Sequence, residues 1–245
     1  MDATAGTVAN ARNLPNWEAP FPLAETLRRE LGVPVYLGND VGVAVEAEAT
    51  LGAGRRYRTF LGLWWGTGVG GAIMIDRQRW LGRGAAGEIG HTVVKIGGAR
   101  CPCGRRGCLE AYAGRNAMEL RARRAVKRGA KTSLFELMKQ HRRDRLTSAV
   151  WADAIEQRDE LAERLIERAI QALGAGTASA INLIDLEAVV IGGGLGTRLG
   201  EPVTERIRQA MLPHLFVSDR PPDVRLSELG DLGGAIGAAR LVPTA

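Results

Sequence analysis

The chain has 245 residues, a formal charge of +6, 45% hydrophobic residues and 24% charged residues. This balance is typical of a globular protein with one large or two small domains, and it excludes a generally disordered chain. No apolar run approaches the ~20 residues of a membrane helix. Residues 1–17 show neither the basic leader nor the apolar segment of a secretory signal, so we expect a cytoplasmic protein.

The basic residues do not by themselves indicate a polyanionic partner. Only four of the 33 are lysines, a skew that is more typical of coding bias in a GC-rich genome. The densest stretch, Arg121 to Arg145, is interrupted by acidic residues and has no interleaved aromatic residues. Such a stretch is typical of solvated helical faces, so we expect no nucleic-acid partner for this chain and no membrane partner.

The first elements are expected between residues 33 and 84. Residues 33–38 (VPVYLG) predict a buried strand, and a helix is expected to begin after Asn39-Asp40 and to end at the glycines near residue 52. Residues 59–84 predict three strands, with a glycine-rich turn at Gly66–Gly71 and a second turn at Asp76–Gln78.

In the rest of the chain, predicted strands and helices also alternate. Residues 85–110 predict a loop with short elements, and residues 115–170 predict helices, most clearly the amphipathic segment that begins near Asp159. Residues 186–196 predict a buried strand that enters a triple-glycine turn, and a small-residue helix is expected after Gly233-Gly234. Strands that alternate with helices indicate the α/β class.

One histidine and all three cysteines of the chain form a metal-ligand pattern. The pattern is His91-x9-Cys101-x-Cys103-x4-Cys108, and it supplies three thiolates and one imidazole. That set completes a tetrahedral zinc shell, and an odd cysteine count argues against a disulfide framework. The sequence therefore predicts a structural zinc ion rather than a catalytic one.

Two glycine-rich turns are candidate phosphate or nucleotide sites. In the first, Gly66, Thr67 and Gly68 offer backbone amides and a hydroxyl, and in the second, Gly193 and Gly194 follow a buried strand. Each turn alone is equally typical of a tight connection without a ligand. Two such turns in one α/β chain favour a nucleotide.

The remaining polar candidates are ambiguous from spacing alone. Asn39-Asp40 lies where α/β proteins place ligands, but both residue types are also preferred helix caps, and capping is the stronger interpretation. Glu88, His91 and Glu110 flank the cysteine loop. They are suited to a polyhydroxy ligand, yet they also suit partners of the metal ligands or surface charges.

Several segments together resemble the ROK family of sugar kinases and sugar-responsive repressors. They are GTGVGG (66–71), AGEIGH (86–91) and CPCGRRGCLE (101–110), with NLPNW (13–17), GNDVGVA (38–44) and VVIGGGLG (189–196) in the same order. Within the family, the chain is most similar to bacterial ATP-dependent glucokinases.

The resemblance implies an actin-like ATPase, ribonuclease-H-like fold of two lobes, with a truncated small lobe. Residues 1–55 would be the remainder of the small lobe, residues 56–230 the large lobe, and residues 231–245 a C-terminal helix that returns to the small lobe. It also implies a homo-oligomer, either a dimer or a tetramer.

The resemblance implies phosphorylation of a hexose, with glucose converted to glucose 6-phosphate and ATP with Mg²⁺ as co-substrate. Asp40 would be the general base. Asn39, Glu88, His91 and Glu110 would bind the sugar, and His91 would also ligate zinc. Gly66, Thr67 and Gly68 would bind phosphate, while Gly193 and Gly194 would flank the adenosine.

The sequence departs from the family pattern at its start and in the helix after Asp40. Family kinases open with an Asp-x-Gly-x-Thr phosphate hairpin, and nothing like it precedes NLPNW. We therefore expect residues 1–245 to phosphorylate glucose poorly, and a sugar-sensing transcriptional regulator or an inactive sugar-binding protein are the alternatives. Val41-Gly42 stands where relatives usually carry Ala-Asn.

Overall fold

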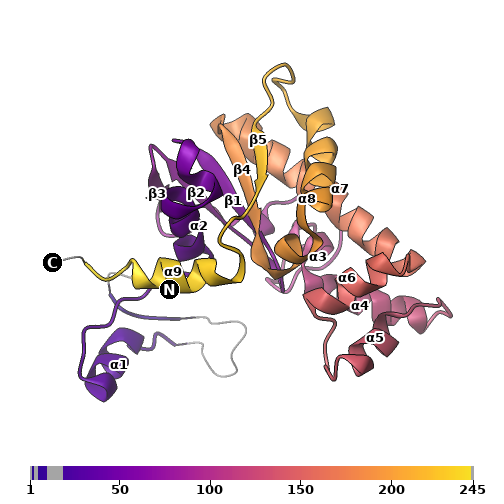
Figure 1. Ribbon diagram of the computed structural model, residues 1–245, viewed down its shortest axis with the longest axis horizontal. Coiled ribbons are helices and arrows are strands. Elements are labelled where there is room, and N and C mark those ends of the chain that lie inside the picture. Colours follow the sequence, from indigo (N-terminus) through magenta and orange to yellow (C-terminus); the bar gives the residue numbers. More distant parts are fainter. Residues whose placement is uncertain (1, 3–4, 10–18, 244–245) are drawn as a thin grey trace.

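The fold is built on one five-stranded mixed sheet (Figure 1). The computed structural model describes residue 2, residues 5–9 and residues 19–243. The strands are β1 (Phe60–Trp65), β2 (Val69–Ile75), β3 (Gln78–Trp80), β4 (Ala188–Gly192) and β5 (Asp223–Leu226), in the order β3-β2-β1-β4-β5. Strand β1 is antiparallel to β2 and parallel to β4, so it joins the hairpin half of the sheet to the parallel half.

Strands β1 to β3 form the meander expected from the sequence. The β2–β3 turn places Asp76 and Arg77 at φ angles of 48° and 64°. Two consecutive positive φ angles are typical of the type I′ turn, whose twist matches that of the flanking strands. The turn directs the short edge strand β3 back along β2.

Helices cover both faces of the sheet. Alternate residues of β1 point in opposite directions, so Phe60 packs with the helix α2 (Asp40–Leu51) while Leu61, Leu63 and Trp65 pack on the other face. That other face is covered by α7 (Glu160–Ile184) and α8 (Gly193–Met211), as Figure 1 shows. The C-terminal helix α9 (Gly233–Ala239) packs against α2.

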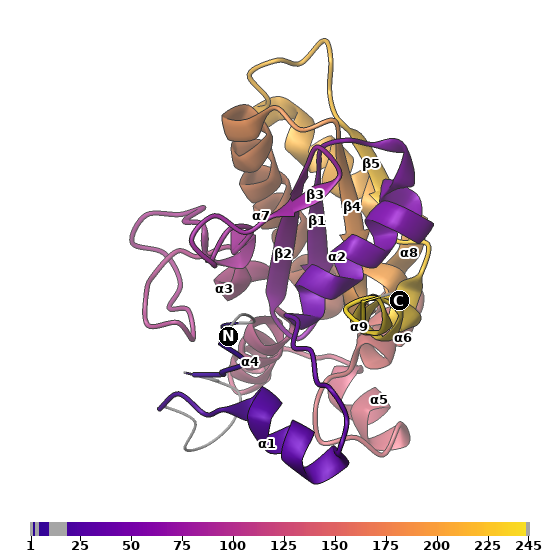
Figure 2. The same cartoon turned by 90° about the vertical axis from the view of Figure 1, so that its left-hand side faces the viewer.

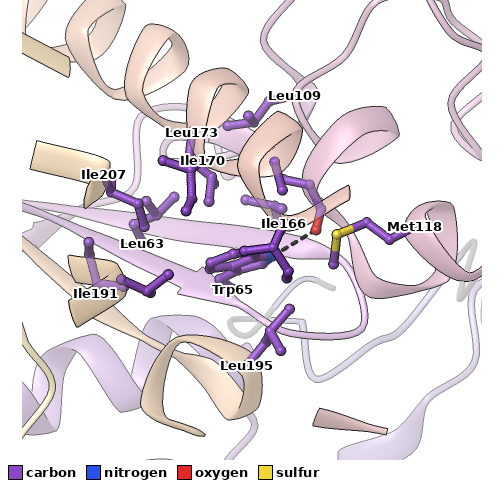
Figure 3. Packing of buried hydrophobic residues seen from close by; sticks show 14 of the residues in the cluster. Leu63, Trp65, Leu109, Met118, Ile166, Ile170, Leu173, Ile191, Leu195 and Ile207 are labelled. Carbon is purple, nitrogen blue, oxygen red and sulfur yellow. Dashed lines mark hydrogen bonds between the residues drawn. The ribbon is translucent and has the colours of Figure 1, made fainter. Parts of the chain in front are cut away.

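Trp65 lies at the centre of the larger core (Figure 3). Its side chain is fully buried among apolar side chains of α7 and α8, and its indole Nε1–H donates a hydrogen bond of 2.7 Å to the Ala113 carbonyl. This bond satisfies the one polar atom of the side chain and ties the sheet to α3 (Glu110–Ala113).

The remaining helices are short. They are α1 (Leu23–Leu31), α4 (Arg115–Val126), α5 (Leu134–Gln140) and α6 (Ser148–Glu156), with 3₁₀ turns η1 (Ala53–Arg56), η2 (Ile89–His91), η3 (Leu212–His214) and η4 (Gly230–Leu232). Helix α1 lies apart from the sheet in both views (Figures 1 and 2). No helix among the described residues is long and apolar enough to cross a membrane.

The expected buried strand at residues 33–38 is wrong. This segment forms no described strand, and Val33 and Tyr36 are 53% and 47% exposed. Its apolar, β-branched residues suit a strand, but a strand also needs a neighbour, and no other described strand lies beside it. The helix after Asn39 and its end at Gly52 are confirmed.

Candidate active site

One cavity of about 530 Å³ gathers most of the predicted site residues. It lies where the start of α2, the β1–β2 turn, the η2 segment and the start of α8 meet. Its lining includes Asn39, Asp40, Gly66, Thr67, Gly68, Glu88, His91, Cys103, Glu110, Gly193 and Gly194. Cys101 and Cys108 are buried and do not reach it, and residues 13–17 (NLPNW) lie outside the described residues.

Asn39 and Asp40 form the first turn of α2. The Asn39 side chain accepts a hydrogen bond of 2.9 Å from the Gly42 amide, so the capping interpretation is confirmed for Asn39. Asp40 is the first residue of the helix, and its side chain is exposed to the cavity.

The AGEIGH segment is positioned by two glycines that press it against β2. A Cβ on Gly90 would lie 1.9 Å from the Val69 carbonyl oxygen, and one on Gly87 would lie 2.7 Å from the Ala72 Cα atom. Gly87 also has a φ of +86°, which favours glycine. This close approach turns the intervening Glu88 and the following His91 into the cavity.

The predicted metal ligands converge on one point. Ligand atoms of His91, Cys101, Cys103 and Cys108 all lie within 4.8 Å of one another. The Cys103 and Cys108 sulfurs are 3.7 Å apart, and the Cys101 sulfur is 3.9 Å from His91 Nδ1. Zn–S bonds of about 2.3 Å place two tetrahedral thiolates about 3.8 Å apart, so the donor set and the Cys103–Cys108 separation fit a zinc ion.

The three thiols differ in acidity. Burial raises the pKa of Cys101 to about 12, and burial also raises that of Cys108. Burial opposes ionisation of Cys103 too, but hydrogen bonds from the backbone and side chain of Arg105 lower the pKa of Cys103 to about 6. Cys103 is therefore the thiolate most readily available to a metal cation at neutral pH.

Glu110 links the cysteine loop to the glycine-rich turn. Its Oε2 accepts a hydrogen bond of 3.1 Å from the Val69 amide, and its Oε1 lies 3.8 Å from the Cys101 sulfur. A Cβ on Gly68 would lie 2.3 Å from Oε2, so a larger residue there would displace this carboxylate from its present position. The two motifs therefore share one rigid wall of the cavity.

A second cavity of about 540 Å³ continues from the first at Gly194. Between them, α8 begins at Gly193, whose φ of +80° and contact with the Trp65 backbone require glycine. No side chain caps this helix start, so its amides are available to an anion. The second cavity is lined by Arg115, His141, Arg143, Thr147, Ser148, Ala149, Gly194, Thr197, Arg198 and Asp231.

Two features of these cavities were not predicted from the sequence. Arg115 and Ser148 meet across 33 residues, and such long-range contacts leave no local pattern. Trp64 lines the first cavity, where its ring lies over Gly192. Its apolar strand context indicated only a core residue.

The strand order, the covering helices and the cleft define an α/β protein with an actin-like ATPase fold. The ROK family model matches residues 1–245, so the chain belongs to the ROK family. It is 32% identical to the glucokinase of Thermotoga maritima over 99% of this chain and 76% of that protein.

Two further relatives show the range of the family. The crystal structure of a ROK family glucokinase from Streptomyces griseus, in complex with glucose and AMPPNP, superposes with a TM-score of 0.83. It is 30% identical, over 99% of this chain and 78% of that chain. The xylose repressor of Caldicellulosiruptor bescii is 26% identical over 99% of this chain and 60% of the repressor.

Proposed function

We propose that this protein is an ATP-dependent hexose kinase and that glucose is its substrate. The observation that carries the proposal is the shared cavity, in which Asp40 lies in one wall and the Gly66–Gly71 turn in another. Phosphoryl transfer depends mainly on positioning and on charge stabilisation, with one carboxylate to orient the attacking hydroxyl. The cavity offers these elements around a space large enough for a monosaccharide.

We assign the role of general base to Asp40. It would accept the proton of the sugar 6-hydroxyl as that oxygen attacks the γ-phosphorus of ATP. Asn39, Glu88, His91 and Glu110 are assigned to the other hydroxyls. Their carboxylate, amide and imidazole groups line the same cavity and suit a polyhydroxy ligand.

The donor is assigned to the glycine-rich turn and the start of α8. Backbone amides of Gly66 to Gly68 and the Thr67 hydroxyl would bind phosphate oxygens. Gly193 and Gly194 lie at the uncapped N-terminus of α8, and Gly194 opens into the second cavity, which we assign to the adenosine of Mg²⁺-ATP.

Zinc is assigned to His91, Cys101, Cys103 and Cys108, where it would supply structural cross-linking of the loop. His91 Nδ1 is directed to the cysteines, and the His91 side chain also lines the sugar cavity. Holding the imidazole at one nitrogen would fix its other nitrogen toward a sugar hydroxyl.

Asp40→Asn tests the assigned general base. The amide preserves shape but cannot accept the proton, so turnover should fall about 10²- to 10⁴-fold while glucose affinity changes little. Glucose 6-phosphate is measured with a coupled dehydrogenase, at an enzyme concentration high enough to detect a low turnover. Asp76→Asn, in the exposed β2–β3 turn, is the control. A variant that keeps its turnover would show that Asp40 only supports the helix.

A sugar-sensing regulator is the second candidate, because a repressor matches almost the whole chain. The two functions separate experimentally. A kinase forms sugar phosphate with ATP, and its kcat/KM across a panel of hexoses is expected to be highest for glucose. A protein that binds sugar but forms no product with any hexose would contradict the kinase assignment and favour a regulator or an inactive sugar-binding protein.

A further inference from the structure

Arg115 lies at the junction of the two cavities, as the first residue of α4. Its backbone amide donates to the Gly66 carbonyl at 3.1 Å, and the next amide, of Asn116, donates to the Thr67 carbonyl at 3.1 Å. The start of α4 is thereby fixed to the glycine-rich turn. The Arg115 side chain consequently has a defined position beside the predicted phosphate site.

The guanidinium of Arg115 is held by two neutral hydroxyls. Nη1 donates to Ser148 Oγ and Nη2 donates to Thr67 Oγ1, both at 2.9 Å. Two of its five N–H donors are used in these bonds, and the planar group remains oriented at the cavity edge.

No described carboxylate neutralises this cation. The nearby Glu119 is already paired with Arg123 at 2.7 Å and with Arg145 at 3.4 Å. Burial, and then the like charge of Arg145, hold the pKa of Arg115 below its usual value. A half-buried cation without an anion is costly, and an anionic ligand at this point would remove that cost.

The surroundings favour an anion of several charges. Arg143 and Arg198 line the same second cavity, whose one acidic lining residue is Asp231. The uncapped start of α8 adds backbone amides at the junction. Guanidinium groups bind phosphate oxygens through short, charge-assisted hydrogen bonds.

We propose that Arg115 binds the phosphate chain of the nucleotide donor, where that chain passes from the adenosine cavity to the glycine-rich turn. This inference rests on the proposed kinase function and adds a side-chain phosphate ligand to it. The two hydroxyls orient the guanidinium before the donor arrives, so that its three remaining donors face the phosphates.

The test compares the affinities of ADP and adenosine by calorimetry. Arg115→Ala should weaken ADP binding about 10- to 100-fold, the range for hydrogen bonds between charged groups, and should leave adenosine binding unchanged. Arg124→Ala removes an exposed arginine from the same helix and should change neither affinity. Thermal unfolding of each variant checks that the fold is kept.

Two further variants distinguish phosphate binding by Arg115 from a purely structural role, in which Arg115 only stabilises the glycine-rich turn through its hydrogen bonds. Arg115→Lys keeps the charge and should recover most of the ADP affinity, whereas Arg115→Gln keeps a donor for the hydroxyls and should not. Rescue by glutamine but not by lysine would overturn the inference, as would an unchanged ADP affinity in Arg115→Ala. If the unmodified protein binds neither ADP nor ATP, the kinase function itself fails.

Discussion

Cys103 and His91 are the two predicted zinc ligands that also line the first cavity, so Cys103 connects the predicted zinc ion to the proposed substrate site. Cys103→Ser should remove most of the zinc, because serine replaces a thiolate with a poor ligand. The sugar affinity should fall as well, since His91 loses its anchor.

Metal analysis of purified protein and glucose titrations test this expectation. One zinc ion per chain is expected in the unmodified protein. Arg100→Ala changes an exposed residue of the same loop and should keep the metal. A serine variant that retains stoichiometric zinc would remove Cys103 from the ligand set.

Among the elements, α2 shows an unusual pairing of a glycine with an arginine. The Arg79 guanidinium of β3 occupies the space beside Gly42, where a Cβ would meet Nη1 at 1.8 Å, and Arg79 Nε lies 3.0 Å from Glu46 Oε1. The sequence departure at position 42 therefore makes room for a side chain from a distant strand.

Gly42→Ala should not give the stabilisation that a glycine-to-alanine change usually gives in a helix. In an open helix position the change stabilises by roughly 1 kcal/mol, but here the methyl group would displace Arg79. In an Arg79→Ala background the same change should recover that stabilisation. Urea unfolding of the four proteins gives the coupling, and equal effects of Gly42→Ala in both backgrounds would contradict this account.

At the start of α7, Asp159 combines a helix cap with contacts to the preceding loop. Its carboxylate accepts bonds from the Ala162 and Ser133 amides and from the Thr132 hydroxyl. Burial opposes ionisation, but these hydrogen bonds outweigh it and lower the pKa of Asp159.

A carboxyl group whose pKa is lower in the folded state stabilises the fold when the pH is above its pKa in the unfolded state, which is about 3.9. That stabilisation is lost as the pH falls through the pKa of the folded state. Asp159→Ala should therefore cost roughly 2 kcal/mol at pH 7 and less near pH 3. Urea unfolding at both pH values measures the difference. A cost that does not depend on pH would show that the ionised form has no special role.

Over the whole molecule, Glu48 joins segments that are far apart in the chain. This fully buried carboxylate of α2 accepts bonds from the Ala53 amide, the Ser227 hydroxyl and the amides of Glu228 and Leu229. It fixes the segment between β5 and α9 onto α2, which carries Asp40.

Glu48→Gln places an amide NH₂ where a carboxylate oxygen accepts backbone N–H groups. At least one backbone donor is then left unsatisfied, so unfolding should become easier by about 1–3 kcal/mol. Glu201→Gln on the exposed side of α8 is the control. Hydrogen exchange in α9 should accelerate in the Glu48 variant, and unchanged protection there would contradict the assigned contact.

Much of the fold is predictable where local pattern and tertiary contacts agree. The glycine-rich β1–β2 hairpin, the amphipathic α7 and the buried β4 are examples. Strand β5 was not predicted because it is four residues long and carries Asp223 and Arg225 at the sheet edge. Residues 33–38 show the converse, since their composition favours a strand that has no described neighbour.

The candidate site was predictable only where its residues form motifs. The four predicted metal ligands lie within a span of 18 residues, from His91 to Cys108, and their convergence follows from one loop. The contact of Arg115 with Thr67 and Ser148 depends instead on how α4 packs against the sheet and α6. Such contacts arise from tertiary packing, so the spacing of residues along the sequence does not predict them.

The position of Trp64 gives the cleft an optical reporter. Among the described tryptophans, Trp65 and Trp151 are fully buried and Trp80 lies on the edge strand, whereas the Trp64 indole forms part of the cavity wall. Indole emission depends on contact with water. Filling of the cleft by a ligand should therefore shift or quench the fluorescence of Trp64, so that binding can be followed in unlabelled protein.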